Sequence, residues 1–340
     1  QEGRILKSIK VNKPGGLDKL SFEDFNPRKP GINEIQVEIK ASSLNFHDYL
    51  VAVGLLPVDE GRIPLSDGAG IVSEVGAGVE SFSKGDKVLG YFFPNWDDGS
   101  ASMEKMSGIP GDNVDGFASQ IVTMSASAFG PMPGNLDFLP ASTLPCAGLT
   151  AWRAMMVEAH LKPGDWVLTQ GTGGVSIFAI QFARMMGCKI VATSSSQAKL
   201  DRLKTLGVDE VINYRENSDW GDIVNELTGG KGANLVVEVG GSGTIAQSVR
   251  AVSVGGIISM IGVLTGFAGE VPLAELFQKN ARIVGITVGS KKDQKDMIAA
   301  VEANDLNPVL DKTFNLENLA DAFRLQESQR HFGKIGVEIK

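Results

Sequence analysis

The sequence predicts an α/β protein with a β-rich first domain and a second domain built on a doubly wound parallel sheet. Three observations lead to this prediction. Short runs of alternating apolar and polar residues, cut by Gly, Pro and Asp, fill residues 1 to about 125. From residue 166 onward, apolar strands alternate with helical segments, and a glycine-rich turn separates the first of these strands from the first helix.

The composition limits the class of protein. A chain of 340 residues is long enough for two domains, and 43% hydrophobic with 21% charged residues is typical of a globular protein with a full core. The formal charge of -8 argues against a nucleic-acid partner, and no apolar run is long enough to cross a membrane. Because Cys146 and Cys188 can build neither a disulfide framework nor a four-cysteine zinc lobe, we expect a cytoplasmic protein.

The first domain is expected to be a twisted β structure. The segments "EIQVEIKA" (34–41) and "GAGIVSEVG" (68–76) have the alternation of half-buried strands. The polar, glycine-dotted segment 93–116 predicts a long surface loop. Residues 141–165 have apolar positions at helical spacing and end in Pro-Gly, so a second domain is expected to begin near residue 140.

The second domain is expected to consist of parallel βαβ units. The predicted strands are 166–170, 189–194, 210–214, 233–241 and 255–263, and the predicted helices are 175–187, 198–207, 219–228 and 244–253. The last residues, 322–340, predict a helix and then a strand that can return to the sheet of the first domain.

The glycine turn predicts a dinucleotide site. Gly171, Gly173 and Gly174 lie between a predicted strand and a predicted helix, where bare backbone can approach a pyrophosphate at the helix N-terminus. The sixth position of this fingerprint is Ser176, which is small but is not glycine. The alternative is an ordinary tight turn in a sheet with another use.

The end of the second strand predicts which dinucleotide is bound. An NAD site commonly holds the adenosine ribose with an Asp or Glu at this place, but residues 193–196 of this chain are Thr-Ser-Ser-Ser. These hydroxyls can donate to a 2′-phosphate without adding negative charge, Lys199 adds a cation, and Tyr214 can contact the same phosphate. We therefore expect NADPH rather than NADH; the alternative is that the serines only cap the next helix.

Six segments together resemble one superfamily. They are "ASSLNFHDYL" (41–50), "RIPLSDGAGIVSEVGAGV" (62–79), "KGDKVLG" (84–90), "LPCAGLTAW" (144–152), "GTGGVSIFAIQFA" (171–183) and "HFGKIGV" (331–337). With them the chain resembles the medium-chain dehydrogenase/reductase superfamily over nearly its whole length. The resemblance implies a GroES-like catalytic domain of residues 1–147 and 288–340, with a Rossmann domain of residues 148–287 inserted in it.

Within that superfamily the chain looks like a zinc-independent member. Zinc-bearing members have Cys, His and Cys where this chain has Asn45, Ser66 and Cys146, and the first two are poor zinc ligands. The chain is similar to quinone oxidoreductases of the zeta-crystallin type, in which this Asn lies near the nicotinamide. The residues expected to bind NADP(H), from the glycine turn, the serine run and this resemblance, are Thr150, Gly171, Thr172, Gly173, Gly174, Val175, Ser194, Ser195, Lys199, Tyr214, Gly262, Val263, Ser290 and Lys334.

These expectations lead to an NADPH-dependent oxidoreductase that needs no metal. Its substrate is expected to be a quinone or an α,β-unsaturated carbonyl compound, because these accept hydride with less electrophilic help than an unactivated ketone. Asn45 is the leading polar group, and His47 can donate a proton or contact a cofactor phosphate. A packing role for His47 is the alternative, and Asp48 and Asp67 are expected to be structural.

Two other functions stay open at this point. One is an alcohol or aldehyde dehydrogenase of the same superfamily, which would need a metal or a strong acid in the site. The other is a non-catalytic NADPH-binding protein, because some relatives of this branch serve as lens crystallins. We also expect a homodimer, chiefly because relatives form them; the segments 255–263 and 281–290 could pair at an exposed sheet edge.

Overall fold

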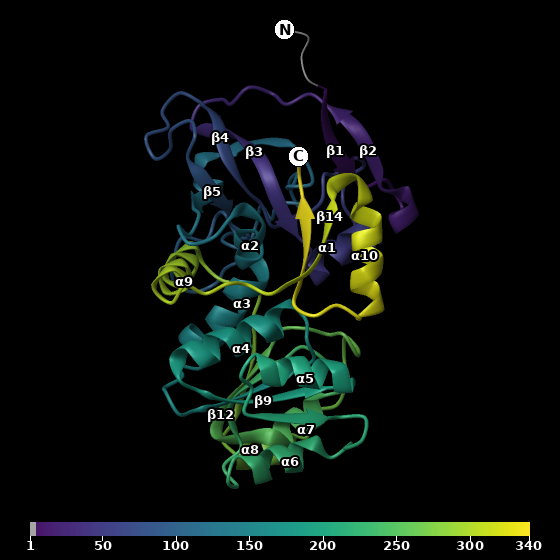
Figure 1. The fold of residues 1–340 in the computed structure, drawn as a ribbon, viewed down its shortest axis with the longest axis vertical. Helices are drawn as coiled ribbons and strands as arrows, with labels where there is room; N and C mark the ends of the chain where they lie inside the picture. The colour runs from purple at the N-terminus through teal and green to yellow at the C-terminus, as the bar shows by residue number, and fades with distance from the viewer. Residues whose placement is uncertain (1–4) are drawn as a thin grey trace. The chain divides into compact units, whose positions relative to one another are not determined.

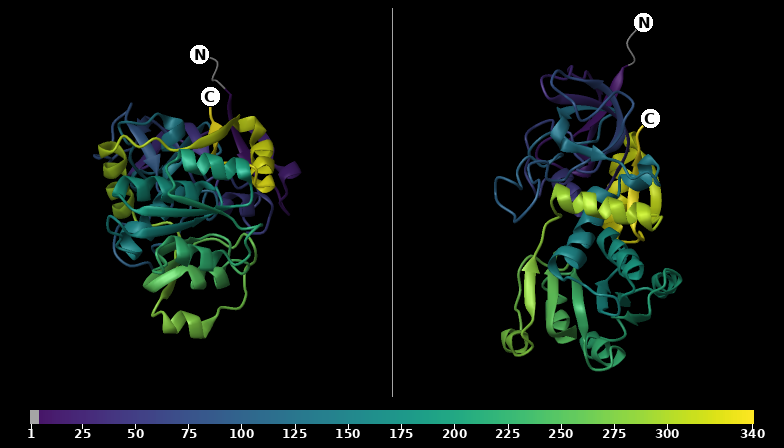
Figure 2. Two further views of the ribbon diagram at one scale, coloured as in Figure 1. Left: turned by 60° about the horizontal axis from the view of Figure 1, so that its bottom comes forward. Right: turned by 90° about the vertical axis from the view of Figure 1, so that its left-hand side faces the viewer.

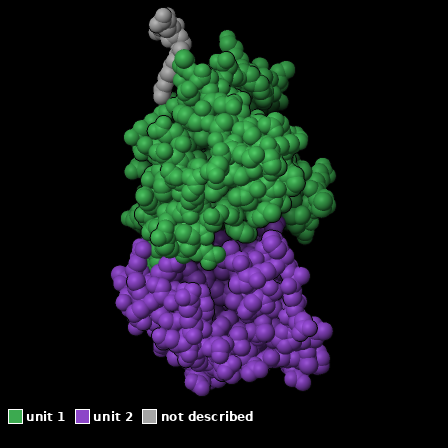
Figure 3. All heavy atoms as spheres, turned by 90° about the vertical axis from the view of Figure 1, so that its right-hand side faces the viewer, with its two compact units in different colours: residues 1–149, 288–340 green, residues 150–287 purple. Residues whose placement is uncertain are grey.

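The computed structural model describes residues 5–340, which form two compact units. Of the described residues, 5–149 and 288–340 form unit 1 and 150–287 form unit 2 (Figure 3), so that the second unit is an insertion in the first along the chain. Each unit has its own large sheet. No helix within residues 5–340 is both long enough and apolar enough to cross a bilayer.

The large sheet of unit 1 is mixed. Its order is β14-β15-β3-β4-β5-β7, with β6 also paired to β3, while β1 and β2 form a separate hairpin sheet. The C-terminal strand β15 pairs with both β14 and β3, so the chain returns to the first sheet as its sequence predicts. The strands are β1 (Leu6–Lys10), β2 (Ser21–Phe25), β3 (Glu34–Ser43), β4 (Ala69–Val75), β5 (Lys87–Gly90), β6 (Ile121–Ser125), β7 (Phe129–Pro131), β14 (Leu310–Asn315) and β15 (Lys334–Glu338).

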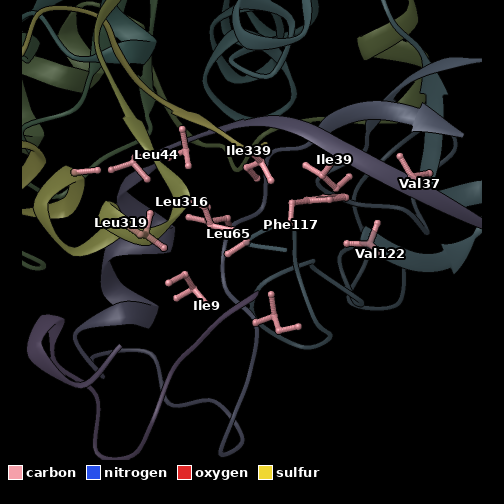
Figure 4. Packing of buried hydrophobic residues seen from close by; sticks show 14 of the residues in the cluster. Ile9, Val37, Ile39, Leu44, Leu65, Phe117, Val122, Leu316, Leu319 and Ile339 are labelled. Carbon is pink, nitrogen blue, oxygen red and sulfur yellow. The ribbon is translucent and has the colours of Figure 1, made fainter. Parts of the chain in front are cut away.

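The core of unit 1 joins segments from both ends of the chain (Figure 4). Val37 and Ile39, alternate residues of β3, pack in one cluster with Phe117 and with Leu319. A Cβ on Gly68 would lie 2.4 Å from the Phe117 ring, so a glycine is required beside this core. The helices of the unit are α1 (Phe46–Ala52), α2 (Phe138–Ala141), α9 (Lys291–Ala303) and α10 (Leu319–Ser328).

The sheet of unit 2 is parallel and doubly wound. Its order is β10-β9-β8-β11-β12-β13, so the chain moves outward from β8 in one direction and then returns to build the other half from β11. The carboxyl ends of β8 and β11 therefore adjoin where the direction reverses, the place at which such sheets bind ligands. The strands are β8 (Trp166–Gln170), β9 (Lys189–Ser194), β10 (Glu210–Asn213), β11 (Ala233–Glu238), β12 (Val252–Met260) and β13 (Arg282–Gly285).

Helices cover both faces of this sheet (Figures 1 and 2). The longest, α4, buries Phe178 and Phe182 and ends at Gly187, whose φ of 80° gives the left-handed conformation that favours glycine. The helices of unit 2 are α4 (Gly174–Met186), α5 (Gln197–Thr205), α6 (Trp220–Leu227), α7 (Ile245–Ala251) and α8 (Leu273–Gln278), while α3 (Leu149–Trp152) lies where the chain enters the unit. The α/β fold class predicted from the sequence is confirmed.

Two local features differ from the prediction. The segment 141–165 is not one regular helix, because π-helical turns at Leu144–Gly148 and Arg153–Glu158 flank α3. Pro145 lies in the first of these turns and has no N–H to donate. Helix α9 was not predicted, although Ser290 and Asp293 form a capping box in which each side chain accepts the other residue's backbone N–H.

Candidate active site

The glycine turn of unit 2 exposes bare backbone at the start of a helix. Gly173 is the N-cap residue of α4, and no side chain caps this helix end. A Cβ on Gly171 or Gly173 would meet no atom within 4 Å, so there is open space beside the turn. Ser176 donates from Oγ to the Gln170 carbonyl at 2.7 Å, which ties the helix to β8 despite the missing glycine. The turn therefore fits a pyrophosphate group.

The residues after β9 were expected to form either a 2′-phosphate site or only a helix cap, and they contain groups suited to both roles. Ser196 is the N-cap of α5, where its Oγ accepts from the Lys199 N–H at 3.4 Å, so one serine does serve as a cap. Ser195 and Lys199 are half-buried, and Tyr214 is 41% exposed directly after β10. The Tyr214 N–H donates to the Ser194 carbonyl at 3.2 Å, which holds the two strand ends together. Binding of a 2′-phosphate here stays a prediction.

The other predicted cofactor residues divide into two sets. One set lies with the glycine turn at the carboxyl edge of the unit 2 sheet and consists of Thr172, Gly174, Val175, Gly262 and Val263. The other set lies elsewhere: Thr150 is in α3, Ser290 caps α9, and Lys334 begins β15. Contacts of either set with a cofactor stay predictions.

Asn45 of unit 1 lies in a buried polar cluster. It is the N-cap of α1, and its backbone N–H donates to Asp48 Oδ2 at 3.0 Å in an Asn-x-x-Asp capping box. Its side-chain Nδ2 donates to Asp48 Oδ2 at 3.0 Å and to Asp67 Oδ2 at 2.8 Å. Ser66 joins the cluster, because its N–H donates to Asp48 Oδ1 at 2.9 Å. Both acids are thus held against one amide group.

Lys334 brings a cation into this cluster. The side chain is 3% exposed, and its Nζ lies 2.6 Å from both the Leu44 carbonyl and Asn45 Oδ1. Asp67 Oδ2 is 3.6 Å from the same nitrogen. The ammonium takes the amide oxygen of Asn45 while the two acids take the amide hydrogens, so the orientation of this side chain is fixed.

Burial dominates the electrostatics of the cluster. It raises the pKa of Asp67 to about 6, with the Lys334 charge lowering it and the Asp48 charge raising it. Burial also raises the pKa of Asp48, against the lowering effects of His47 and Lys334. The pKa of the Cys146 thiol lies well above its usual value because of burial and then the Asp67 charge. Cys146 is therefore a neutral thiol rather than a reactive thiolate.

His47 pairs with an acid that the sequence did not single out. Its Nε2 lies 2.9 Å from Asp112 Oδ2, and its ring packs edge-on against Phe92. Burial lowers the pKa of His47, but the Asp112 hydrogen bond and the charges of Asp48 and Asp112 outweigh burial, so the pKa is raised. The buried Nδ1 has no hydrogen-bond partner in the part of the chain that the structure describes.

The segment 93–116 that carries Asp112 is only in part the surface loop predicted from the sequence. Phe93 and Trp96 at its start are 3% and 2% exposed, and their rings pack together. Burial of these two large aromatic side chains is favourable, so this end of the segment belongs to the core although the residues that follow are polar. The polar remainder supplies Asp112 to the site.

The residues at the three zinc-ligand positions do not fit that metal. Asn45, Ser66 and Cys146 occupy them, and Asn45 and Ser66 are neutral oxygen donors that zinc seldom uses. The Lys334 ammonium already contacts the Asn45 oxygen and would repel a divalent ion. Across residues 5–340, no group of three or more His, Cys, Asp or Glu side chains is arranged to hold a metal.

Comparison with known proteins gives the family. Residues 31–134 match the alcohol dehydrogenase GroES-like domain, and residues 174–303 match the zinc-binding dehydrogenase family. A zinc-type alcohol dehydrogenase-like protein of Schizosaccharomyces pombe is 39% identical, over 98% of this chain and 99% of the relative. The chain belongs to the medium-chain dehydrogenase/reductase superfamily. As a member of this superfamily it is an oxidoreductase.

Two further relatives indicate the range of chemistry among similar medium-chain dehydrogenase/reductases. A solved NAD-dependent alcohol dehydrogenase is 33% identical and superposes with a TM-score of 0.91, over 98% of this chain and all of the other. An acryloyl-coenzyme A reductase of Sulfurisphaera tokodaii is 25% identical, over 98% of this chain and 100% of the relative. An alcohol dehydrogenase and an acryloyl-coenzyme A reductase are thus both among the relatives.

Proposed function

We propose that this medium-chain dehydrogenase/reductase uses NADPH to reduce a quinone or an α,β-unsaturated carbonyl compound without a bound metal. The observation that carries the proposal is the Lys334 ammonium, 2.6 Å from Asn45 Oδ1 in the cluster where zinc-bearing relatives place their ligands. A site of this kind polarises its substrate only through hydrogen bonds and a buried cation, which suits an acceptor that is already activated.

The cofactor part of the proposal rests on unit 2. The turn at Gly171 and Gly173 would hold the pyrophosphate, and the hydroxyls of Ser194 and Ser195 with the Lys199 ammonium would hold a 2′-phosphate. When bound, the reduced nicotinamide supplies the hydride. Tyr214, 41% exposed beside the end of β9, would lie against the phosphate or the adenine.

The proton in the proposed reaction would come from His47. Hydride addition at the β-carbon leaves an enolate, which must take up one proton to become the saturated carbonyl product. Because Nε2 is engaged by Asp112 and Nδ1 has no hydrogen-bond partner within residues 5–340, Nδ1 of a protonated His47 would carry the proton that is transferred. Asn45 would contact the substrate oxygen that gains negative charge. Its Nδ2 donates to Asp67, and protonation of Asp67, whose pKa is about 6, would weaken that hydrogen bond and make an amide hydrogen available to the substrate.

An alcohol dehydrogenase activity is the second candidate, because the solved NAD-dependent alcohol dehydrogenase is 33% identical to this chain. A panel of enones, enoyl thioesters, quinones and primary alcohols, each assayed with both dinucleotides, separates the candidates. Turnover of a conjugated carbonyl or quinone with NADPH supports the proposal. Turnover confined to alcohols with NAD would contradict it, and cofactor binding without any turnover would favour a non-catalytic protein.

We further propose a homodimer formed through unit 2. Strand β13 is an edge of its sheet, paired only with β12 in the strand order. The segment joining these strands exposes four large apolar side chains: Leu264 at 47%, Phe267 at 76%, Leu273 at 69% and Phe277 at 69%. Apolar groups beside an open sheet edge favour pairing with a second copy.

A further inference from the structure

The last residue of β11 in unit 2, Glu238, has a buried carboxylate. Glu238 is 0% exposed, and its carboxylate oxygens accept only from N–H and O–H groups. Oε2 accepts from the N–H groups of Gly240 at 2.8 Å and Gly241 at 3.1 Å and from Thr244 Oγ1 at 2.7 Å. Oε1 accepts from Ser248 Oγ at 2.8 Å. The chain after β11 is thus folded back onto one side chain.

Gln170 connects this carboxylate to the glycine turn. It is the last residue of β8 and stands directly before Gly171. Its Nε2 donates to Ser248 Oγ at 2.8 Å, and Ser248 in turn donates to Glu238. Its Oε1 lies 3.3 Å from the backbone nitrogens of both Val239 and Gly240. The carboxyl ends of β8 and β11, where the sheet reverses direction, are therefore joined by a chain of buried side chains.

The backbone of residues 238–240, which the carboxylate holds at Gly240, in turn contacts the loop after β12. The Gly262 N–H donates to the Glu238 carbonyl at 3.2 Å, and Thr265 donates to the Gly240 carbonyl from both N and Oγ1 at 2.7 Å. A Cβ on Gly262 would lie 2.6 Å from the Val239 carbonyl, so the two loops approach as closely as backbone allows. Displacing residues 239–241 would therefore displace Gly262 and its neighbour Val263.

We propose that Gln170, Ser248 and Glu238 are positioning residues that hold the loop 261–266 at a fixed distance from the glycine turn. The inference rests on the proposed binding of NADPH along this edge of the sheet, with the pyrophosphate at the turn and the nicotinamide at Gly262 and Val263. A cofactor that spans both features binds well only when their spacing is set before it arrives.

Within residues 5–340, the carboxylate at Glu238 accepts from two backbone N–H groups and two hydroxyl groups. A glutamine of the same shape would offer one acceptor oxygen. Its NH2 group would face either the N–H groups of Gly240 and Gly241 or the Ser248 hydroxyl, which already accepts from Gln170 and would lose the acceptor for its own hydrogen. Buried donors without an acceptor are costly, so the loop would shift to reach other acceptors. The loss should then appear at the nicotinamide half of the site and leave the adenosine half intact.

The test compares Glu238→Gln with the wild type in the full-length protein. We expect the dissociation constant for NADPH to rise about tenfold or more, the effect of about one lost buried hydrogen bond, and kcat with an enone to fall as well. The affinity for 2′,5′-ADP, which carries only the adenosine half of the cofactor, should stay within about twofold, since its expected sites after β9 and β10 are not joined to Glu238.

A matched control lies at the opposite edge of the same sheet. Thr228 Oγ1 accepts the Gly232 N–H at 2.7 Å and is buried, so Thr228→Val also leaves a buried donor without its acceptor. It should keep wild-type affinity for both ligands. The inference fails if Glu238→Gln binds NADPH as the wild type does, or if NADPH and 2′,5′-ADP lose affinity in the same proportion. A wild-type protein that binds neither ligand would instead overturn the proposed function.

Discussion

At the scale of single residues, the buried Lys334 ammonium is the main departure from a zinc site. Two acids, Asp48 and Asp67, surround one amide, and the ammonium 3.6 Å from Asp67 offsets part of their charge. A lysine buried at 3% exposure is costly unless such partners are present. Removal of the Lys334 ammonium should therefore destabilise the protein, because the buried acids Asp48 and Asp67 would lose the positive charge that offsets theirs.

Lys334→Met should destabilise unit 1 by about 3–5 kcal/mol, the usual cost of breaking a buried ion pair by removing one partner. Because Lys334 lowers the pKa of Asp67, its loss moves that pKa further above about 6. An acid whose folded-state pKa is raised contributes stability at low pH that is lost as the pH rises through that value. The loss should therefore be smaller at pH 5 than at pH 8, as urea unfolding would show.

Lys340→Met is the control for that measurement, since the Lys340 ammonium forms an exposed pair with Glu338. The Lys340→Met substitution should lower the free energy of unfolding by no more than about 1 kcal/mol. A loss for Lys334→Met that is this small, or that is the same at both pH values, would show that the ammonium does not compensate the buried acids.

The pairing of His47 with Asp112 gives a prediction for the pH dependence of turnover. Since Asp112 raises the pKa of His47, Asp112→Asn should lower it and move the alkaline limb of the kcat/KM profile to lower pH. His47→Asn should lower kcat by about 100-fold or more, within the usual range for loss of a general acid. Asp115→Asn, in the same loop but bound to Arg62 at 3.0 Å, should leave the profile in place. An unmoved limb in Asp112→Asn would exclude His47 as the proton donor.

At the scale of elements, the βα turn between β8 and α4 is a place where a substitution can weaken cofactor binding without lowering the stability of the protein. Gly173 has a negative φ of -74°, and a Cβ there meets no atom within 4 Å, so a side chain does not strain the protein. Gly173→Val should keep the wild-type unfolding midpoint but weaken NADPH binding by about 30-fold or more, because the side chain fills the space for the pyrophosphate.

Gly134→Val provides the comparison for the turn, because a Cβ on Gly134 also meets no atom within 4 Å. It should leave both stability and NADPH binding unchanged. Equal NADPH affinity in Gly173→Val and the wild type, measured by isothermal titration, would show that the phosphates lie elsewhere.

The elements of unit 2 were predictable because local signals agree there. The predicted helix at 219–228 and strand at 210–214 correspond to α6 and β10, within one residue at each end. Apolar periodicity and turn residues act over short distances, so they place such elements. The segment 141–165 has the same periodicity, but Pro145 and the π-helical turns interrupt it, which spacing alone does not reveal.

The polar cluster of unit 1 was predictable only in part. Asn45 was chosen from the resemblance, but its partners come from distant segments: Asp67 follows 22 residues later and Lys334 follows 289 residues later. Asp112 lies 65 residues from His47 in a loop with no regular structure. Contacts across such separations depend on tertiary packing, and the spacing of residues in one sequence does not contain them.

At the scale of the whole molecule, the proposed dimer gives a prediction about mass. Leu273→Asp with Phe277→Asp places charges on the apolar segment beside β13, and we expect light scattering to show half the wild-type mass at the same concentration. Ile32→Asp with Met103→Asp, at side chains of unit 1 that are 77% and 87% exposed, should keep the wild-type mass. A wild-type mass of 36.1 kDa, that of one chain, would contradict the dimer.

The central claim, reduction by NADPH in a metal-free site, is tested most directly by the rate of NADPH oxidation with an enone after exhaustive dialysis against a zinc chelator. The account predicts an unchanged kcat, no gain on adding zinc, and a kcat/KM for NADPH well above that for NADH. Loss of turnover on chelation that zinc restores would contradict it.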